Sequence, residues 1–162
     1  MAIMRMVVMG VSGCGKSSVG EEIARLTSAQ FVDGDDLHPE ANKAKMGAGI
    51  PLDDNDRWPW LDRVGEVLAG PKGAIVACSA LKRVYRDRIR AAAPGTVFVH
   101  LDGSRELLLE RISARVNHFM PASLLDSQLA ILEPLGSDEN GVTLPITASV
   151  KSLAMAAVAA VA

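Results

Sequence analysis

The sequence predicts a three-layer α/β fold, in which a five-stranded parallel sheet carries helices on both faces. Short apolar runs that do not alternate with polar residues are typical of strands buried on both sides, and the segments between them have helical spacing. Because crossovers between parallel strands are right-handed, the helices must cover both faces. The expected strands are Ile3–Met9, Gln30–Val32, Ala74–Ala77, Val97–Leu101 and, less clearly, Val142–Ile146.

The helices are predicted from apolar side chains that recur on one face of each intervening segment. The tail after Ser149, a residue type that caps helices, reads as a closing core helix. The apolar faces are Val19 with Ile23 and Leu26; Leu81 with Tyr85 and Ile89; Leu108 with Ile112; and, in the tail, Val150 with Leu153, Ala157 and Val161.

Length and composition indicate one domain, residues 1–162, with its own core. Hydrophobic residues make up 49% and charged residues 22%, which excludes a disordered chain. The net charge of −2 argues against a nucleic-acid partner held by a basic surface. Local pockets of positive charge remain compatible with that sum.

Cysteine usage and hydropathy predict a soluble cytoplasmic protein without a membrane partner. Cys14 and Cys78 have neither metal-site nor disulfide-framework spacing, which favours a reducing compartment. The start lacks the features of a signal peptide, and the apolar tail is shorter than the roughly 20 residues that span a bilayer.

The loop after the first strand fits the phosphate-binding pattern G-x-x-x-x-G-K-[ST], with GVSGCGKS at residues 10–17. Gly13 and Gly15 let successive backbone N–H groups point inward, and the helix that starts at Lys16 adds its positive end. We expect Lys16 to reach the β- and γ-phosphates of ATP and Ser17 to ligate Mg²⁺. An ordinary glycine turn is the alternative, and Cys14 is expected to pack inertly. The expected nucleotide-binding residues of this loop are Gly10, Val11, Ser12, Gly13, Cys14, Gly15, Lys16, Ser17 and Ser18.

Two carboxylates after the second strand complete the predicted phosphoryl-transfer site. The third strand runs into Cys78-Ser79 instead of the aspartate of motor-type ATPases, and the chain lacks the Asn-Lys-x-Asp motif of GTPases. If the strand alternation continues, Asp33 and Asp35 point to the same side, Asp33 toward Mg²⁺ and Asp35 as the base for a substrate hydroxyl. An acidic turn that caps the next helix is the alternative.

Cations with helical spacing suggest anion contacts on two later helices. Lys82, Arg86 and Arg90 recur at every fourth position, and Arg111 and Arg115 repeat that spacing. Like charges so spaced oppose helix formation, and an anionic partner offsets this cost. We expect Arg111 and Arg115 on a lid over the triphosphate, and Arg90 on the surface. A solvated face, on which Arg83 pairs with Asp87, is the alternative.

Residues 38–60 mix both signs of charge with both tryptophans and three prolines. A polar, rigid insertion beside Asp35, the expected proton acceptor, is suited to bind a hydroxylated anionic substrate. Arg57 can take a carboxylate, while His38 and Lys82 serve hydroxyls. Alternatively, His38 is structural and Trp58 or Trp60 packs the insertion onto the domain.

From Gly10 to Pro134 the motifs resemble those of the gluconokinase family of small P-loop kinases, relatives of shikimate and nucleoside monophosphate kinases. The resemblance departs at Asn117, where the family usually has glycine, and at Leu144–Ile146, where an Asp-bearing strand end is usual. The matching segments are the phosphate loop, Gly34-Asp35 with His38-Pro39, Asn42 with Lys45-Met46, Gly49 to Leu52, Asp56-Arg57 with Pro59-Trp60-Leu61, Cys78 to Lys82 with Tyr85-Arg86-Asp87, His118 to Pro121, and Ser127-Gln128 with Leu132-Glu133-Pro134.

The resemblance implies a P-loop kinase fold with a substrate-binding insertion at about 35–62 and a small helical lid at about 111–125. It implies transfer of phosphate from ATP, with Mg²⁺, to the 6-hydroxyl of D-gluconate, and commonly a homodimer. It places Lys16, Asp35 and Arg115 in catalysis and Arg111 and Arg115 over the nucleotide. The substrate residues it implies are Asp35, His38, Arg57, Ser79, Lys82, Arg86 and His118. The alternatives are a kinase of another small hydroxy acid, such as shikimate, and a non-catalytic nucleotide-binding regulator.

Overall fold

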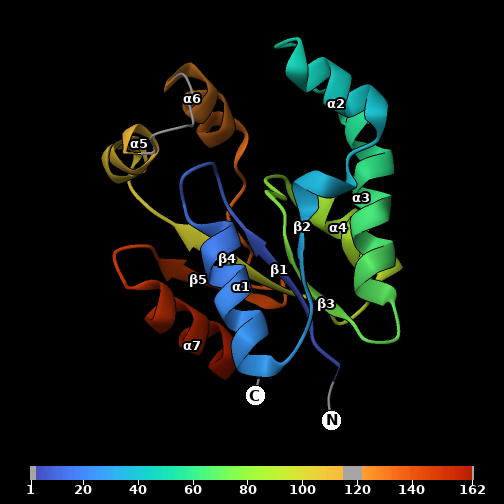
Figure 1. Ribbon diagram of the computed structural model, residues 1–162, viewed down its shortest axis with the longest axis vertical. Helices are drawn as coiled ribbons and strands as arrows, with labels where there is room; N and C mark the ends of the chain where they lie inside the picture. The colour runs from blue at the N-terminus through green and yellow to red at the C-terminus, as the bar shows by residue number, and fades with distance from the viewer. Residues whose placement is uncertain (1–2, 115–121, 162) are drawn as a thin grey trace.

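The computed structural model describes residues 3–114 and 122–161, which form a five-stranded parallel sheet flanked by helices (Figure 1). The strand order is β2-β3-β1-β4-β5, so the first strand lies at the centre. This confirms the expected fold class and all five expected strands, whose ends differ from the expected ones by at most two residues. The strands are β1 Arg5–Met9, β2 Phe31–Asp33, β3 Ala74–Ala77, β4 Val97–Asp102 and β5 Gly141–Pro145.

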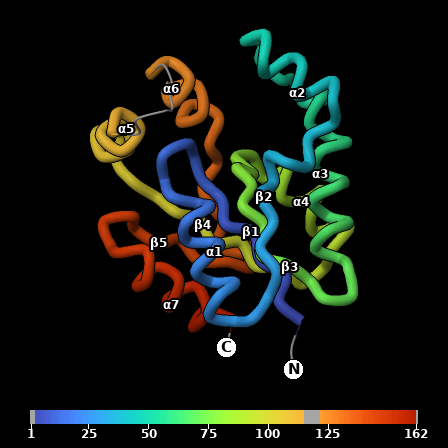
Figure 2. Tube along the Cα trace, in the orientation of Figure 1, coloured from blue at the N-terminus to red at the C-terminus, as the bar shows by residue number. Residues whose placement is uncertain are grey.

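Helices cover both faces of the sheet (Figure 1). On one face α1 packs against α7, and on the other α3 packs against α4. The shorter α2, α5 and α6 lie beyond the end of the sheet where the phosphate loop emerges, and the chain ends lie at the opposite end (Figure 2). The helices are α1 Lys16–Thr27, the 3-10 helix η1 Gly34–Leu37, α2 Glu40–Gly47, α3 Asp54–Ala69, α4 Arg83–Ala92, α5 Arg105–Ser113, α6 Ala122–Ile131 and α7 Val150–Ala160.

The central strand divides two aliphatic cores. Met6 and Val8 of β1 belong to the cluster beneath α1 and α7, whereas Val7 and Met9 belong to the cluster beneath α3 and α4. Successive side chains of a strand point to opposite faces, so a strand covered on both faces must be apolar throughout. This explains why the first strand shows no alternation in the sequence.

Two of the expected apolar stripes extend less far than predicted. Val19 and Ile23 are buried, but Leu26 is 41% exposed; Leu153 and Ala157 are buried, but Val150 is 43% exposed. Both exposed residues lie in a terminal turn of their helix. Ser149 caps α7 as expected, with its side chain accepting the N–H of Ser152.

The last strand tolerates its proline because it lies at the edge of the sheet. Pro145 is the final residue of β5, which pairs only with β4. A proline at such a position removes no donor that an inner ladder would need. No helix in the described ranges is long and apolar enough to cross a membrane.

Candidate active site

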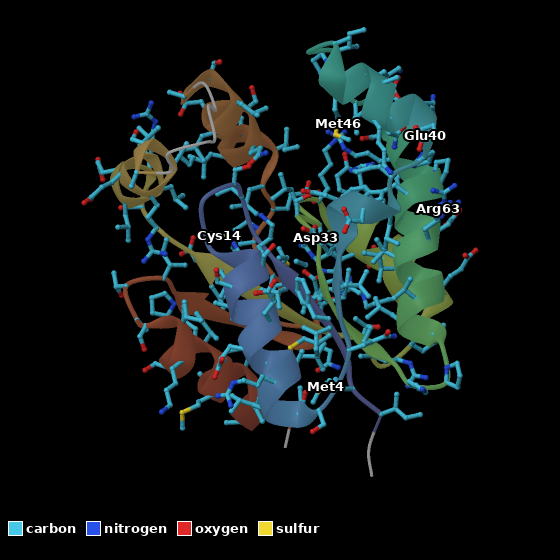
Figure 3. The ribbon with its side chains drawn as sticks, in the orientation of Figure 1. Met4, Cys14, Asp33, Glu40, Met46 and Arg63 are labelled. Carbon is cyan, nitrogen blue, oxygen red and sulfur yellow. The ribbon has the colours of Figure 1, made fainter. Side chains whose placement is uncertain are left out.

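The loops after β1, β2 and β3 meet at one edge of the sheet, as expected for parallel strands. The N–H of Gly10 donates to the carbonyl of Ser79 at 3.3 Å, which ties the phosphate loop (Gly10–Ser17) to the loop after β3. Figure 3 labels Cys14 in the phosphate loop and Asp33 at the end of β2, both at this edge. The three loops therefore form one site.

The phosphate loop has the backbone that an anion-binding nest requires. Gly10, Gly13 and Gly15 all have positive φ, and α1 begins at Lys16. The Lys16 ammonium donates to the carbonyls of Gly10 at 3.1 Å and Val11 at 3.2 Å, so it lies folded over the loop. The side chain of Cys14 is buried in the core, which confirms its packing role.

A hydrogen bond connects helix α6 to the phosphate loop. Gln128, the α6 residue in this bond, was not among the expected site residues. The side-chain oxygen of Gln128 accepts the N–H of Ser12 at 2.7 Å. The two residues lie 116 positions apart, so no local pattern could have paired them. The contact joins α6, at a residue just after the expected lid segment, to the loop that would hold the phosphates.

Asp33 and Asp35 lie together, but the predicted reason is wrong. Strand β2 ends at Asp33, and Asp35 belongs to η1, so no strand alternation relates them. Instead Asp33 caps η1, its carboxylate accepting the N–H of Asp35 at 3.0 Å. A side chain on Gly34 would collide with the carbonyl of Ala77, so only glycine lets this turn approach β3 so closely.

The environment of Asp35 suits a general base. Desolvation raises its pKa, the neighbouring Asp33 raises it further, and the nearby Lys16 opposes the rise. A carboxylate with a raised pKa is a stronger base, which favours Asp35 as the group that accepts a proton. Cys78 beside it is inert as a nucleophile, since burial raises the pKa of its thiol to about 12.

A site for Mg²⁺ would combine Ser17 with Asp33. Ser17 is exposed in the first turn of α1, and one carboxylate with a hydroxyl is the oxygen donor set that Mg²⁺ uses when phosphates supply further ligands. In residues 3–114 and 122–161, no group of three His, Cys, Asp or Glu side chains forms a self-sufficient metal site. The donors fit an ion that arrives with the nucleotide.

The insertion forms an arm of two helices, α2 and α3, held together by polar contacts. Lys45 of α2 makes two hydrogen bonds to the carboxylate of Asp56 in α3, at 2.9 and 2.8 Å. Asp56 and Asp53 form a capping box at the start of α3. Asn42, which is buried, donates to the carbonyl of Asp56 at 2.8 Å.

His38 packs between the two helices of this arm as a neutral, buried side chain. Its ring stacks on Trp60 with centroids 4.1 Å apart and lies 3.1 Å from the side-chain nitrogen of Asn42. Burial lowers the pKa of His38 to about 4, and the charges of Arg57 and Lys43 act in the same direction. Trp60 donates its indole N–H to the carbonyl of Gly34, so the tryptophan packs the arm onto the domain.

Four residues at the base of the arm form what we call the acceptor cluster: Asp54, Arg57, Lys82 and Tyr85. Arg57 and Lys82 lie over the Tyr85 ring, 5.4 and 5.5 Å from its centroid. The Tyr85 hydroxyl accepts from Arg57 at 3.1 Å and donates to Asp54. The expected substrate cations Arg57 and Lys82 are thus brought together, and both are partly open to solvent. Asp54 and Tyr85 were not among the expected site residues.

Arg86 has a different environment from the substrate contact expected of it. Its side chain is fully buried and forms two hydrogen bonds to Glu139, at 2.8 and 3.0 Å. It also donates to the carbonyl of Ala80 at 2.9 Å. Burial alone would raise the pKa of Glu139, but hydrogen bonds, first from Arg86, lower it to about 2. The contacts indicate that Arg86 supports the loop before α4 from within.

Two expectations about the neighbouring arginines are wrong. Arg90 is not a free surface residue, because it donates to the buried Glu139 at 2.8 Å and lies over the Phe98 ring. Arg83 pairs with Asp138 instead of Asp87, which binds Arg90. Helical spacing predicted a pair between Arg83 and Asp87, but Arg83 instead binds Asp138, a carboxylate from the loop before β5.

The segment predicted to form a lid, about 111–125, lies only in part within the described residues. Arg111 lies in α5 and donates to the carbonyl of Ile146, after β5, at 2.6 Å.

Lys82 precedes α4 as its N-cap, so it is not part of a helical stack with Arg86. Ser79 contributes its carbonyl to Gly10, and Ser18 is exposed on α1. Arg115 and His118 lie outside the described residues.

Comparisons with known proteins agree with this arrangement. A family model described as "AAA domain" matches residues 6–135. The thermosensitive gluconokinase of Escherichia coli is 45% identical over 140 residues, 84% of this chain and 75% of the relative. The gluconokinase of Gluconobacter oxydans is 49% identical over 138 residues, 83% of this chain and 78% of its own. The crystal structure of a gluconokinase from Sinorhizobium meliloti has 48% identity and a TM-score of 0.90, covering 98% and 91% of the two chains.

Proposed function

The chain belongs to the gluconokinase family, and we propose that it transfers the γ-phosphoryl group of ATP to the 6-hydroxyl of D-gluconate, forming 6-phospho-D-gluconate and ADP. One observation carries the proposal: the phosphate loop with Lys16, the carboxylate of Asp35 and the acceptor cluster all stand at the same edge of the sheet. The site can therefore bind a polyphosphate beside a hydroxylated anion.

On the phosphate side, the backbone N–H groups of the loop and the ammonium of Lys16 bind the triphosphate. Lys16 must leave the carbonyls of Gly10 and Val11 to reach the phosphates. Ser17 and Asp33 would hold Mg²⁺, which neutralises charge on the phosphates when bound. Arg111 and Arg115 of the lid would neutralise the transferred group.

On the acceptor side, the substrate hydroxyl oxygen attacks the γ-phosphorus while the bond to the β–γ bridging oxygen breaks and ADP leaves. Asp35 accepts the proton of that hydroxyl. Arg57 and Lys82 bind the carboxylate at the other end of the sugar acid. Neutral His38, buried against Trp60 and Asn42, supports the arm and adds no charge that competes for the carboxylate. Positioning and charge stabilisation supply most of the catalysis.

The acceptor assay decides between the candidate kinases. ADP release is measured with gluconate, with shikimate, with a nucleoside monophosphate and without acceptor. We expect stimulation by gluconate alone, and phosphorus NMR should show a phosphomonoester on the terminal carbon. Stimulation by shikimate instead would replace the substrate, and tight ATP binding without turnover on any acceptor would support a regulator.

The role of Asp35 is tested by Asp35→Asn, with Asp36→Asn as the control of equal charge change in the same turn. We expect kcat to fall by about 10²–10⁴-fold in Asp35→Asn while ATP still binds, because an amide cannot accept the proton. Near-normal turnover in Asp35→Asn would remove the residue from this role. A homodimer in the cytoplasm is the accompanying expectation, and sedimentation of the purified protein measures its mass.

A further inference from the structure

We propose that Asp54 sets the charge preference of the acceptor cluster, so that the site accepts one carboxylate and discriminates against doubly charged anions. This inference rests on the proposed function, because it identifies what selects the acidic end of the substrate. Asp54 would act through Arg57 and Lys82, without itself contacting the substrate. It is therefore a specificity residue and not a catalytic one.

The contacts of Asp54 all converge on one of its two oxygens. Oδ1 accepts the hydroxyl of Tyr85 and lies 3.5 Å from Nη1 of Arg57 and 3.6 Å from Nζ of Lys82. The two ion pairs are longer than a charge-assisted hydrogen bond of about 2.7–2.9 Å. Asp54 therefore attracts both cations without using all of their hydrogen-bonding capacity, and each cation can still bind an anion.

Arg57 keeps much of its hydrogen-bonding capacity for a ligand. Its recorded contacts, to Asp54 and to the Tyr85 hydroxyl, both use Nη1. Within the described ranges, Nη2 and Nε have no recorded hydrogen bond, and this edge of the guanidinium matches the two oxygens of a carboxylate. A carboxylate can therefore bind to Arg57 without displacing Asp54.

Asp54 is held in place on several sides. It is the first residue of α3, directly after Asp53, whose side chain caps the helix. Tyr85, its hydrogen-bond donor, is buried and packs edge-on against Trp58. The hydrogen bond from Tyr85, followed by the charges of Lys82 and Arg57, lowers the pKa of Asp54. The carboxylate is thus ionised and fixed whenever the enzyme is folded at neutral pH.

The charges of the cluster then match a monoanion. Arg57 and Lys82 contribute two positive charges and Asp54 one negative, which leaves a single positive charge. A carboxylate neutralises that charge, a neutral polyol leaves it unpaired, and a dianion overcompensates it beside Asp54. Since like charges in a partly desolvated site repel, the dianion should be disfavoured.

The test uses three acceptors whose end group carries no, one or two charges: D-glucitol, D-gluconate and the phosphonate analogue of gluconate at alkaline pH. The three ligands share the hydroxylated chain and differ at the end group, where phosphorus replaces C1 in the phosphonate. Their affinities are measured by calorimetry for the natural protein and for Asp54→Asn. Asp62→Asn is the control, because Asp62 is an exposed carboxylate of the same helix, paired with Arg88. Thermal unfolding verifies that each variant is folded.

We expect the natural protein and Asp62→Asn to bind gluconate best. In Asp54→Asn the ratio of phosphonate affinity to gluconate affinity should rise about tenfold, which corresponds to one added favourable charge contact in a partly exposed site. A second variant, Asp54→Glu, keeps a carboxylate at this position, so its ratio should stay close to that of the natural protein. An unchanged ratio in folded Asp54→Asn overturns the proposal, and so does an equal loss of affinity for gluconate and phosphonate.

The calorimetry separates this inference from the proposed function. If the natural protein fails to phosphorylate gluconate, the proposed function is wrong, but the affinity ratios still report whether Asp54 sets the charge preference. If gluconate is phosphorylated and the ratio does not respond to Asp54→Asn, the function stands and the role of Asp54 is rejected.

Discussion

The two sides of the active site are built in different ways. The phosphate loop is one stretch, Gly10–Ser17, whose glycine conformations and first helical turn are local. In the described part of the chain the side chain of Lys16 donates to two carbonyls of the same loop, and backbone N–H groups of Gly10 and Ser12 make the hydrogen bonds to distant segments. The acceptor cluster draws on the start of α3 and the start of α4, and ion pairs between distant segments support both helices. A local motif builds the first side and tertiary contacts build the second.

This difference predicts which substitutions lower mainly the activity and which lower mainly the stability. A change in the phosphate loop removes a group that acts on ATP, and the fold loses little, because few distant residues depend on that side chain. A change among the supports of the acceptor side leaves buried charge unpaired, which costs folding free energy.

Glu139→Gln should destabilise the protein by about 3–5 kcal/mol, since it removes the charge that pairs with the buried Arg86. Urea unfolding at neutral pH measures the loss. The control is Asp138→Asn, which breaks an exposed pair with the neighbouring Arg83 and should cost less than about 1 kcal/mol. Equal losses in the two variants would mean that burial of the Arg86 pair is not what holds this region.

Lys16→Met should lower kcat/KM by about 10²–10³-fold, the usual loss when one aimed cation or donor disappears from a transition state. Its unfolding free energy should stay within about 0.5 kcal/mol of the natural protein. Steady-state kinetics and urea unfolding of the same sample give both numbers. A large stability loss would show that the phosphate side is not as self-contained as its contacts indicate.

Lowering the pH should reduce the free energy of unfolding through His38, which lies on the acceptor side. The pKa of His38 is lowered from 6.5 to about 4 by burial, so between these values the unfolded chain binds more protons than the folded one. Stability therefore falls as pH drops from 6.5 toward 4, by about 2 kcal/mol from this residue. Urea unfolding at several pH values measures the slope.

His38→Gln should flatten this pH dependence. It should do so only in part, because burial also lowers the pKa of His100. A slope unchanged by His38→Gln would contradict the neutral, buried state of His38. Any further loss below pH 4.5 belongs to groups such as Glu139, whose pKa in the folded protein is about 2.

Asp53→Ala should cost about 1 kcal/mol by removing the N-cap of α3. Because α3 starts with Asp54 and carries Arg57, the KM for gluconate should also rise severalfold. Ser149→Ala removes the N-cap of α7, far from the acceptor cluster, so it should cost a similar free energy and leave KM unchanged. A raised KM in Ser149→Ala would show that general destabilisation, and not the start of α3, alters substrate binding.

Prediction from the sequence was good wherever a short pattern carries the physical constraint. The five strands followed from apolar runs, and the phosphate loop followed from glycine and lysine spacing, with α1 starting at Lys16 as expected. It was poorer where the partner lies far along the chain. Arg83 pairs with Asp138 and not with Asp87, and Gln128 accepts a hydrogen bond from Ser12, which lies 116 positions away.

Lys82, Arg86 and Arg90 illustrate the boundary between the two kinds of information. The sequence by itself determined that three cations recur at every fourth position beside a phosphate-binding fold, because periodicity is a local property. Only the tertiary structure decided which of them is open to a ligand. Glu139 lies 53 residues from Arg86 and pairs with it in the core, whereas Lys82 caps α4 beside Asp54. A buried charge must find its partner within the fold, and a partly exposed one remains available to substrate.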